Sequence, residues 1–383
     1  MTPFQNSPGA KLLTFTASRM LSLPATAAPE KPDIPVIFLA IFLLAAYPAV
    51  AQQLADGRPV PAGDPTLFYV EGNYYVFSSG PGAPIFRSPD LFTWKPLGRV
   101  FDKLPEWATQ AVLKSNDYVW APDILKIGDE YRAYWSTSTP GSRRSVIGFA
   151  SNRTLDPASP DYRWLDRGKV IETFLTNDWN AIDPQCFVDQ EGKVWLAMGS
   201  YWTGIKLHRL DRQTGHLSAE DPTLYSLARR TDVDPPALEG AYLIWRDGYY
   251  YMFVSFDRCH RGVESDYNIR VGRSRRVTGP YADRSGKSLM DSGGTLIFES
   301  QGQVRGPGHN SVLQHNGKTW TAFHYFNDPQ RKGSRVLEIR AVTWDKDGWP
   351  KVGGVIKAPE TLREPAATGN RGSSDTPTRP GNS

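Results

Sequence analysis

The sequence predicts an all-β fold, a five-bladed β-propeller with about four antiparallel strands in each blade. The 383 residues include 12 Trp, 17 Tyr and 17 Phe beside 34 Gly and 31 Pro, which is typical of short strands joined by tight turns. A strand–turn–strand pattern recurs five times along the chain, and a polar residue stands just before each recurrence. A repeat of a few tens of residues predicts a stacked architecture of this kind.

The composition excludes a disordered chain and argues against a nucleic-acid partner. The 44 Lys and Arg residues nearly balance the 40 Asp and Glu residues, which leaves a net charge of +4, and 40% of the residues are hydrophobic. Basic residues are interspersed with acidic ones and form no basic stripe. We therefore expect a globular protein that binds no nucleic acid.

Residues 1–51 are predicted to form a leader that contains a secretory signal peptide. The apolar run VIFLAIFLLAA begins at Val36, and Ala49-Val50-Ala51 follows it with the small residues of a cleavage site. The run is too short to span a bilayer, which takes about 20 residues. We expect a secreted protein, extracellular or periplasmic, that begins near Gln52 and has no membrane attachment after cleavage. A start at Met20 and an uncleaved anchor remain open.

The body is predicted to lie at 52–362 as one catalytic propeller domain, followed by a disordered tail at 363–383. Residues 366–383 contain no large apolar side chain that could pack in a core. The two cysteines, Cys186 and Cys259, are too few for a disulfide framework. Either a single bridge or two buried thiols fits the sequence.

Five predicted β-hairpins define the repeat. Each has a short apolar strand, a turn with Gly and an aromatic or β-branched strand. The hairpins begin at Thr66, Asp123, Gln185, Tyr242 and Ser311. A third strand is predicted after each of them, at Ile85, Ile147, Ile205, Ile269 and Leu337. A β-sandwich with chance similarity is the alternative, but it gives no reason for a polar residue at the same point of every repeat.

The polar residues before the hairpins form the candidate site. They are Asp64, Asp123, Asp183, Glu239 and His309, at intervals of 59, 60, 56 and 70 residues. Innermost strands of a propeller line its central channel, so residues at equivalent repeat positions converge on one axis. Buried like charges are costly unless they are paired, hydrated or used in chemistry. The ring of acids therefore predicts a functional site.

Two facing carboxyl groups are the minimum for glycoside hydrolysis, and a third can raise the pKa of the acid. Each of Asp64, Asp183 and Glu239 could instead be a turn carboxylate that caps backbone N–H groups, but their shared repeat position favours chemistry. The longer side chain of Glu239 suits a proton donor. Asp123 is interpreted as structural.

Three further residues are candidates for contacts with a substrate or an ion. Trp120 and Trp202 are stacking platforms for a sugar face or ordinary core residues. His309 is suited to bind substrate, to tune the acid or to ligate a metal in the channel.

The motifs of this chain resemble those of glycoside hydrolase family 43, a five-bladed propeller family of inverting enzymes that degrade arabinan and xylan. The segments NAIDP from Asn180, GSYWTGIKL from Gly199, VGRSRRVTGPY from Val271 and GPGHNSV from Gly306 look most like those of α-1,5-L-arabinanases. The resemblance covers nearly the whole predicted body.

The resemblance implies a role for each carboxyl group. Asp64 would be the general base, Glu239 the general acid, and Asp183 would raise the pKa of Glu239 and orient it. Residues matched to arabinose-binding positions are Gly141, Asn180, Ala181, Ile182, Ser200, Tyr201 and Trp202. His309 would correspond to a histidine associated with a structural calcium ion in the channel, and the chemistry itself would require no cofactor. The chain departs from the family at Gly63, where relatives often carry His.

The resemblance implies a monomeric enzyme that acts on arabinan or arabino-oligosaccharides, cutting α-1,5-L-arabinofuranosidic bonds at internal positions. An exo-acting α-L-arabinofuranosidase or β-xylosidase of the same family is one alternative. A carbohydrate-binding propeller without catalysis is another, although binding alone would not need a proton donor.

Overall fold

The computed structural model describes residues 52–356, apart from 114, 329 and 331–333. The chain divides into two units, Met1–Pro48 and Ala49–Ser383, and every described residue lies in the second. The predicted leader at 1–51 and the predicted tail at 363–383 lie outside the described residues. Among those that are described, no helix is long and apolar enough to cross a membrane.

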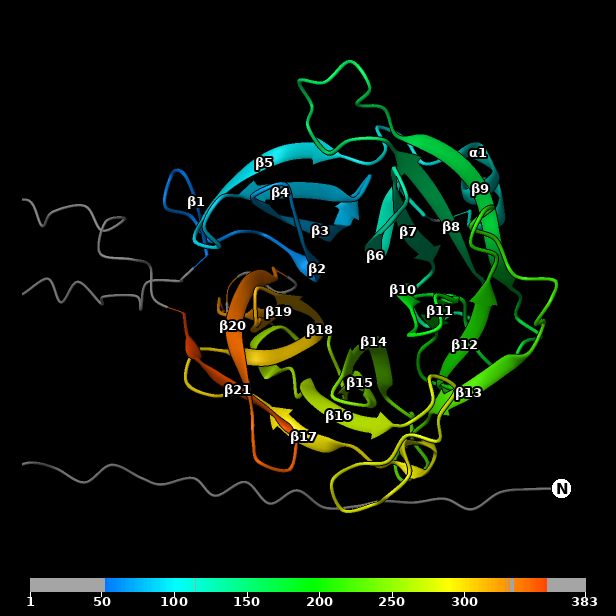
Figure 1. The fold of residues 1–383 in the computed structure, drawn as a ribbon, viewed down its shortest axis with the longest axis vertical. Coiled ribbons are helices and arrows are strands. Elements are labelled where there is room, and N and C mark those ends of the chain that lie inside the picture. The colour runs from blue at the N-terminus through cyan, green and yellow to red at the C-terminus, as the bar shows by residue number, and fades with distance from the viewer. Residues whose placement is uncertain (1–51, 114, 329, 331–333, 357–383) are drawn as a thin grey trace, which may run out of the picture. The chain divides into compact units, whose positions relative to one another are not determined.

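The predicted all-β fold is confirmed, and the strands fall into sets of four antiparallel neighbours (Figure 1). The first set is β2 (Gly63–Val70), β3 (Asn73–Pro81), β4 (Pro84–Ser88) and β5 (Thr93–Arg99). The second is β6 (Tyr118–Ile127), β7 (Glu130–Ser138), β8 (Ser145–Asn152) and β9 (Leu165–Thr173). The third is β10 (Gln185–Val188), β11 (Val194–Met198), β12 (Ile205–Leu210) and β13 (Leu224–Ala228). The fourth is β14 (Leu238–Arg246), β15 (Tyr249–Phe256), β16 (Asn268–Ser274) and β17 (Thr295–Phe298). The last is β18 (Arg305–His315), β19 (Lys318–Phe326), β20 (Val336–Trp344) and β21 (Pro350–Val355).

The five predicted hairpins and the five predicted third strands are confirmed at their expected places. The hairpins are β2–β3, β6–β7, β10–β11, β14–β15 and β18–β19, and the third strands are β4, β8, β12, β16 and β20. Three features were not predicted. Strand β1 (Gln53–Leu54) pairs in parallel with β5, β3 makes a short ladder with β6, and helices α1 (Glu106–Ala111), η1 (Gly262–Glu264) and η2 (Leu289–Asp291) lie in connections.

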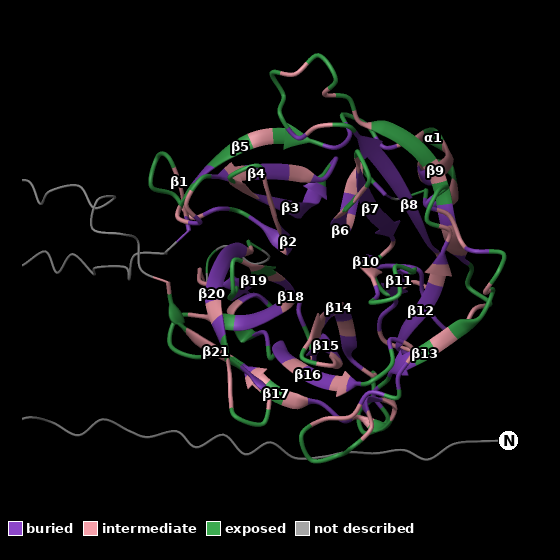
Figure 2. Cartoon of the chain, viewed as in Figure 1, coloured by how far each residue is buried: buried purple, intermediate pink, exposed green. Residues whose placement is uncertain are grey.

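The first strand of each set lies nearest the centre and the fourth lies outermost (Figure 1). Figure 2 shows the same order in burial, because the inner strands are mostly buried and the outer strands carry exposed stretches. The chain therefore presents the beginnings of β2, β6, β10, β14 and β18 to a common central space.

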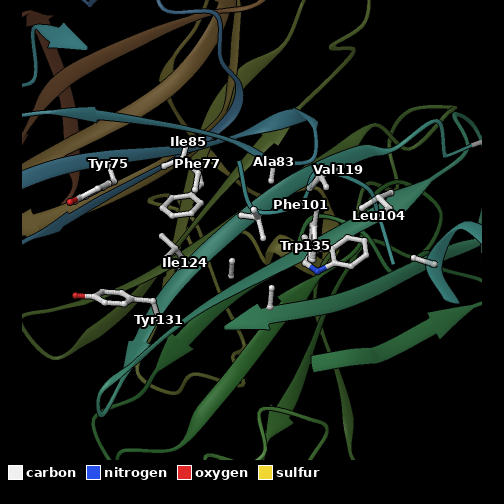
Figure 3. Close-up of a cluster of buried hydrophobic side chains, with 14 of the residues drawn as sticks. Tyr75, Phe77, Ala83, Ile85, Phe101, Leu104, Val119, Ile124, Tyr131 and Trp135 are labelled. Carbon is white, nitrogen blue, oxygen red and sulfur yellow. The ribbon is translucent and has the colours of Figure 1, made fainter. Parts of the chain in front are cut away.

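Apolar side chains fill the spaces between neighbouring sets. Between the first two sets, Phe77, Ile124 and Trp135 belong to one buried cluster (Figure 3). A second cluster joins residues from the two ends of the body, including Val60 and Leu337. There the backbone N–H of Leu337 donates to the carbonyl of Val60 at 3.0 Å. The first and last sets thus pack against each other. Cys186 and Cys259 are both buried and free, so they form no bridge.

Candidate active site

A cavity at the centre is lined by three consecutive residues from each of five segments. The segments are 64–66, 121–123, 183–185, 240–242 and 309–311. The predicted convergence of Asp64, Asp123, Asp183 and His309 is therefore confirmed. Glu239 does not line this cavity itself, but its neighbour Gly240 does. The charge of Glu239 also raises the pKa of Asp183, after the larger effect of burial, so the two carboxyl groups are close.

The backbone corrects one part of the sequence prediction, namely that all five polar residues hold the same repeat position. The equivalent position is a left-handed residue at the start of each innermost strand, with φ between 40° and 61°. It is occupied by Asp64, Ala121, Asp183, Gly240 and His309. The strand register shifts around this residue in β2, β6, β14 and β18, which is the signature of a bulge. Asp123 therefore lies two residues deeper, and Glu239 stands one residue before the bulge of its own strand.

Asp64 is surrounded by groups that stabilise its ionised form. Nη1 of Arg335 donates to both carboxylate oxygens, at 2.9 and 2.8 Å. The hydroxyl of Ser79 donates to Oδ2, and Nδ1 of His309 lies 3.3 Å from Oδ1. Burial is the largest single influence and would raise the pKa of Asp64, but Arg335 and the neighbouring rings of His309 and His324 together hold the pKa well below its usual range. Asp64 is therefore an anion across the ordinary pH range.

His324 contacts the backbone of Asp64, and the hydrogen bonds of the His324 ring determine which of its two nitrogens carries the proton. The backbone N–H of Asp64 donates to Nδ1 of His324 at 3.1 Å, so Nδ1 carries no proton. The ring proton is then on Nε2, which lies 3.3 Å from Sγ of Cys259. Burial lowers the pKa of His324 to about 4, which keeps the ring neutral. This histidine fixes the backbone at Asp64 rather than neutralising its carboxylate.

Asp183 and Glu239 have surroundings of the opposite kind. Oε1 of Glu239 accepts a hydrogen bond from the hydroxyl of Tyr267 at 2.9 Å, and Oδ2 of Asp183 accepts one from the N–H of Gly240 at 3.4 Å. Burial, and to a smaller extent the negative charge of Asp64, raise the pKa of Glu239 to about 7. Burial, then the charges of Glu239 and Asp64, raise the pKa of Asp183 well above its usual range. This pair therefore retains a proton at a pH where Asp64 has none.

Gly240 allows this approach of the fourth and last sets. Its φ is 61°, and a Cβ atom there would lie 3.1 Å from Cγ of His309. Glycine meets both demands, since it adopts positive φ freely and leaves room for the imidazole ring.

Asp123 is buried, two residues further along β6 than Ala121, in line with its predicted structural role. Its Oδ2 accepts a hydrogen bond from the backbone N–H of Cys186 at 2.7 Å, which ties the second set to the third. Burial raises the pKa of Asp123 to about 7.

The residues predicted to bind sugar fall into two groups. The side chains of Asn180 and Ser200 are buried and bonded to each other, with Asn180 Nδ2 donating to Ser200 Oγ at 2.9 Å. Ala181 and Ile182 are buried behind Asp183. These four residues hold the NAIDP segment in place, and any contact of theirs with sugar stays a prediction.

The second group offers exposed surface beside the cavity. Trp120, Tyr201 and Trp202 are half-buried, and Gly141 is exposed on the β7–β8 connection. Tyr201 and Trp202 are consecutive left-handed residues, with φ of 41° and 34°. Such backbone is unfavourable for aromatic residues and gathers at functional sites. A stacking role for these aromatic rings stays a prediction.

Sequence reasoning missed Arg335, His324 and Tyr267. No pattern marks Arg335, which reaches Asp64 from the connection between β19 and β20. His324 had a signal, because it is a histidine between the apolar residues Phe323 and Tyr325 of strand β19. Gly63 explains why Arg335 fits: a Cβ atom on Gly63 would lie 2.3 Å from Cζ of Arg335.

The cavity also bears on the calcium ion that the resemblance implies at His309. Ca²⁺ prefers about six to eight oxygen ligands. Among the described residues, Oδ1 of Asp123 and Oδ1 of Asn310 are buried oxygens without a hydrogen-bond partner, and both residues line this cavity. Within the same part of the chain, no group of three or more His, Cys, Asp and Glu side chains could hold a metal ion. These two oxygens are donors of the kind that Ca²⁺ prefers, and they supply only part of its coordination shell.

Comparison with known proteins places this site in a family. The family model described as Glycosyl hydrolases family 43 matches residues 58–350, which contain all three candidate catalytic carboxyl groups. The chain belongs to glycosyl hydrolases family 43. The resemblance seen in the sequence motifs is thereby confirmed.

Relatives within family 43 include enzymes with both modes of action. An extracellular exo-α-(1→5)-L-arabinofuranosidase of Cellvibrio japonicus is 35% identical over 319 residues, which cover 81% of this chain and 91% of that protein. An extracellular endo-α-(1→5)-L-arabinanase of Bacillus subtilis is 37% identical over 291 residues, 75% of this chain and 86% of that protein.

Solved structures of family 43 arabinanases share the fold. The α-L-arabinanase of Cellvibrio cellulosa in complex with arabinohexaose has a TM-score of 0.74 and 34% identity, over 77% of this chain and 96% of that chain. The family 43 endo-arabinanase of Bacillus licheniformis has a TM-score of 0.70 and 37% identity, over 76% of this chain and 97% of that chain.

Proposed function

We propose that this family 43 hydrolase cleaves the α-1,5-L-arabinofuranosidic bonds of arabinan at internal positions, with inversion at the anomeric carbon. The observation that carries the proposal is the contrast at one site between ionised Asp64 and the Asp183–Glu239 pair, which retains a proton. The relatives named as arabinanases and the neighbour that binds arabinohexaose support arabinan as the substrate.

The chemistry follows from the two protonation states. Asp64 accepts a proton from a water molecule, whose oxygen attacks the anomeric carbon. Glu239 donates its proton to the glycosidic oxygen as the bond to that oxygen breaks. Asp183 acts on Glu239 by sharing its buried environment, which makes ionisation of the pair costly. One direct displacement inverts the anomeric configuration.

A second candidate is exo-action on the same bond. The observation in its favour is the Cellvibrio relative named as an exo-acting arabinofuranosidase. The catalytic carboxyl groups would be the same in both cases.

We infer a five-bladed β-propeller from the sets of four strands and from the cavity lined by one triplet of residues from each of five innermost segments. The finer claims of monomeric state and secretion are proposals as well. Relatives named as extracellular support secretion.

We also propose a structural calcium ion near His309, Asp123 and Asn310. When bound, it would balance the negative charge of the cavity, and no catalytic step depends on it. Removing calcium with a chelator should lower the melting temperature and adding it back should restore that temperature, with Asp123→Asn reducing the response. A melting temperature that does not respond to calcium would reject the ion.

A time course on linear α-1,5-L-arabinan tests the proposed function. An early ladder of oligosaccharides supports endo-action, whereas a single short product from the first minutes supports exo-action. NMR of the first product identifies its anomer, and a retained configuration would reject the direct displacement. No product at all would reject the hydrolase assignment.

A further inference from the structure

The connection between β9 and β10 displays two neighbouring apolar side chains to solvent. Phe174 is 51% exposed and Leu175 is 63% exposed. The connection continues into the NAIDP segment, and Oγ1 of Thr173 accepts a hydrogen bond from the N–H of Ala181 at 3.0 Å. The two apolar side chains therefore lie exposed on the connection that leads from strand β9 to Asp183.

Hydrogen bonds close the turn at Phe174, and Arg144 packs against the Phe174 ring. The N–H of Phe174 donates to Oδ1 of Asn177 at 2.7 Å, and the N–H of Asn177 donates to the carbonyl of Phe174 at 3.0 Å. The guanidinium carbon of Arg144 lies 4.6 Å from the centre of the Phe174 ring. Arg144 is itself held by an ion pair with Glu172 and a 3.1 Å hydrogen bond to the carbonyl of Thr173. The ring is thus oriented before any ligand arrives.

The same turn links the two connections in which sugar contacts are predicted. Arg144 lies on the β7–β8 connection with Gly141. On the other side, the N–H and the hydroxyl of Thr203 donate to the carbonyl of Asp178 at 3.2 and 2.9 Å. Thr203 directly follows Tyr201 and Trp202. The exposed apolar pair is therefore joined on both sides to segments that carry predicted sugar contacts.

We propose that Phe174 and Leu175 form an additional sugar subsite, which holds an arabinose unit of a long chain away from the bond that is cut. This inference rests on the proposed arabinanase function. An oriented aromatic face packs against the C–H groups of a neutral sugar. Arg144 is held beside the ring by Glu172, which also pairs with Lys169. Because the pair is joined to the connections that carry Gly141 and Trp202, both predicted to bind arabinose, the occupant is the extended substrate chain.

The test compares substrates of two lengths. For the unaltered protein and for Phe174→Ala, kcat/KM is measured on arabinohexaose and on arabinotriose. The ratio of the two values should fall about threefold to tenfold in Phe174→Ala, which is the size of one lost aromatic contact. Leu175→Ala should lower the ratio less, and Phe174→Tyr, which keeps the ring, should restore it.

The matched control is Leu165→Ala. Leu165 is also an exposed leucine, 38% accessible, but it begins β9 at the end opposite to Phe174. Its ratio should equal that of the unaltered protein.

Two failures are distinguishable. If the unaltered protein cleaves neither oligosaccharide, the proposed function is wrong and the subsite falls with it. If it cleaves both and Phe174→Ala keeps the ratio of the unaltered protein, the subsite alone is rejected. Binding to the Glu239→Gln protein gives an independent measure: Phe174→Ala should weaken arabinohexaose binding more than arabinotriose binding, and an equal loss would also reject the subsite.

Discussion

Asp64 and Glu239 are both carboxyl groups at the start of innermost strands, and their surroundings differ in charge. Asp64 receives two hydrogen bonds from Arg335 and another from Ser79, whereas Glu239 receives one from the neutral hydroxyl of Tyr267. Burial is the main reason that the pKa of Glu239 rises to about 7, and at Asp64 the same effect is overcome by Arg335 together with the neighbouring His309 and His324. One buried site can therefore hold a protonated acid and an ionised base when only the base has a cationic partner.

The largest expected effect comes from removing either carboxyl group. Glu239→Gln or Asp64→Asn should lower kcat on arabinan by about a hundredfold to ten-thousandfold, because each removes a proton transfer. Both replacements keep the shape of the side chain, so the melting temperature should stay within a few degrees. The exposed Glu299→Gln is the control and should retain full activity. Near-normal turnover in either catalytic variant would end the assignment of roles.

A smaller effect is expected when the positive charge of Arg335 beside Asp64 is removed. Arg335→Met removes the charge that holds the pKa of Asp64 low, so that pKa should rise. Because Asp64 must be ionised to accept a proton, the acidic limb of the kcat/KM profile should move to higher pH. Activity at the optimum should fall about tenfold to a hundredfold, the cost of hydrogen bonds to a charged group.

Two companion variants sharpen the result at Arg335. Gly63→Ala would place a Cβ atom 2.3 Å from Cζ of Arg335, so it should displace the guanidinium and shift the same limb in the same direction by less. Arg58→Met, at a surface ion pair, is the control and should leave the profile unchanged. An acidic limb that stays in place in Arg335→Met would show that other groups keep Asp64 ionised.

The smallest effect is expected when the hydrogen bond from Tyr267 to Glu239 is removed. The hydroxyl of Tyr267 stabilises ionised Glu239, so Tyr267→Phe should raise the pKa of Glu239. Since Glu239 must be protonated to donate, activity is lost as the pH rises through that pKa, and the basic limb should move to higher pH. Tyr225→Phe removes a similar bond to Asp221 at the surface and should change nothing. A basic limb that moves to lower pH would contradict the hydrogen-bond direction.

The repeats were predictable from the sequence because each hairpin is a local pattern of apolar strand, glycine turn and aromatic strand. The alignment of the polar residues within the repeat was less accurate. Matching acid to acid placed Asp123 and Glu239 in the ring, whereas the backbone aligns Ala121 and Gly240 with Asp64. A left-handed residue leaves little trace in sequence, although Pro follows Asp64, Ala121 and Asp183 and could have revealed the true register.

The residues that set the pKa values of Asp64 and Glu239 were less predictable from the sequence. Arg335 and His324 come from the last set and meet Asp64 only after the first and last sets pack together. Local patterns do not carry such long-range pairing. Glu239 could be selected from the sequence as the acid because of its length, but the reason for its raised pKa is burial, which only the folded chain supplies.

The packing of the first set on the last has a consequence for synthesis. Gln52 is fully buried, and its Oε1 accepts the N–H of Ile339 at 3.0 Å, while the carbonyl of Val60 accepts that of Leu337. The first residues of the body to be synthesised therefore pack against residues that are synthesised nearly last. Until β20 emerges, the apolar cluster around Val60 lacks the side chains of Leu337 and Ile339, and we expect a nascent chain released early to aggregate more readily. We therefore expect the contact between the first and last sets to form late in folding.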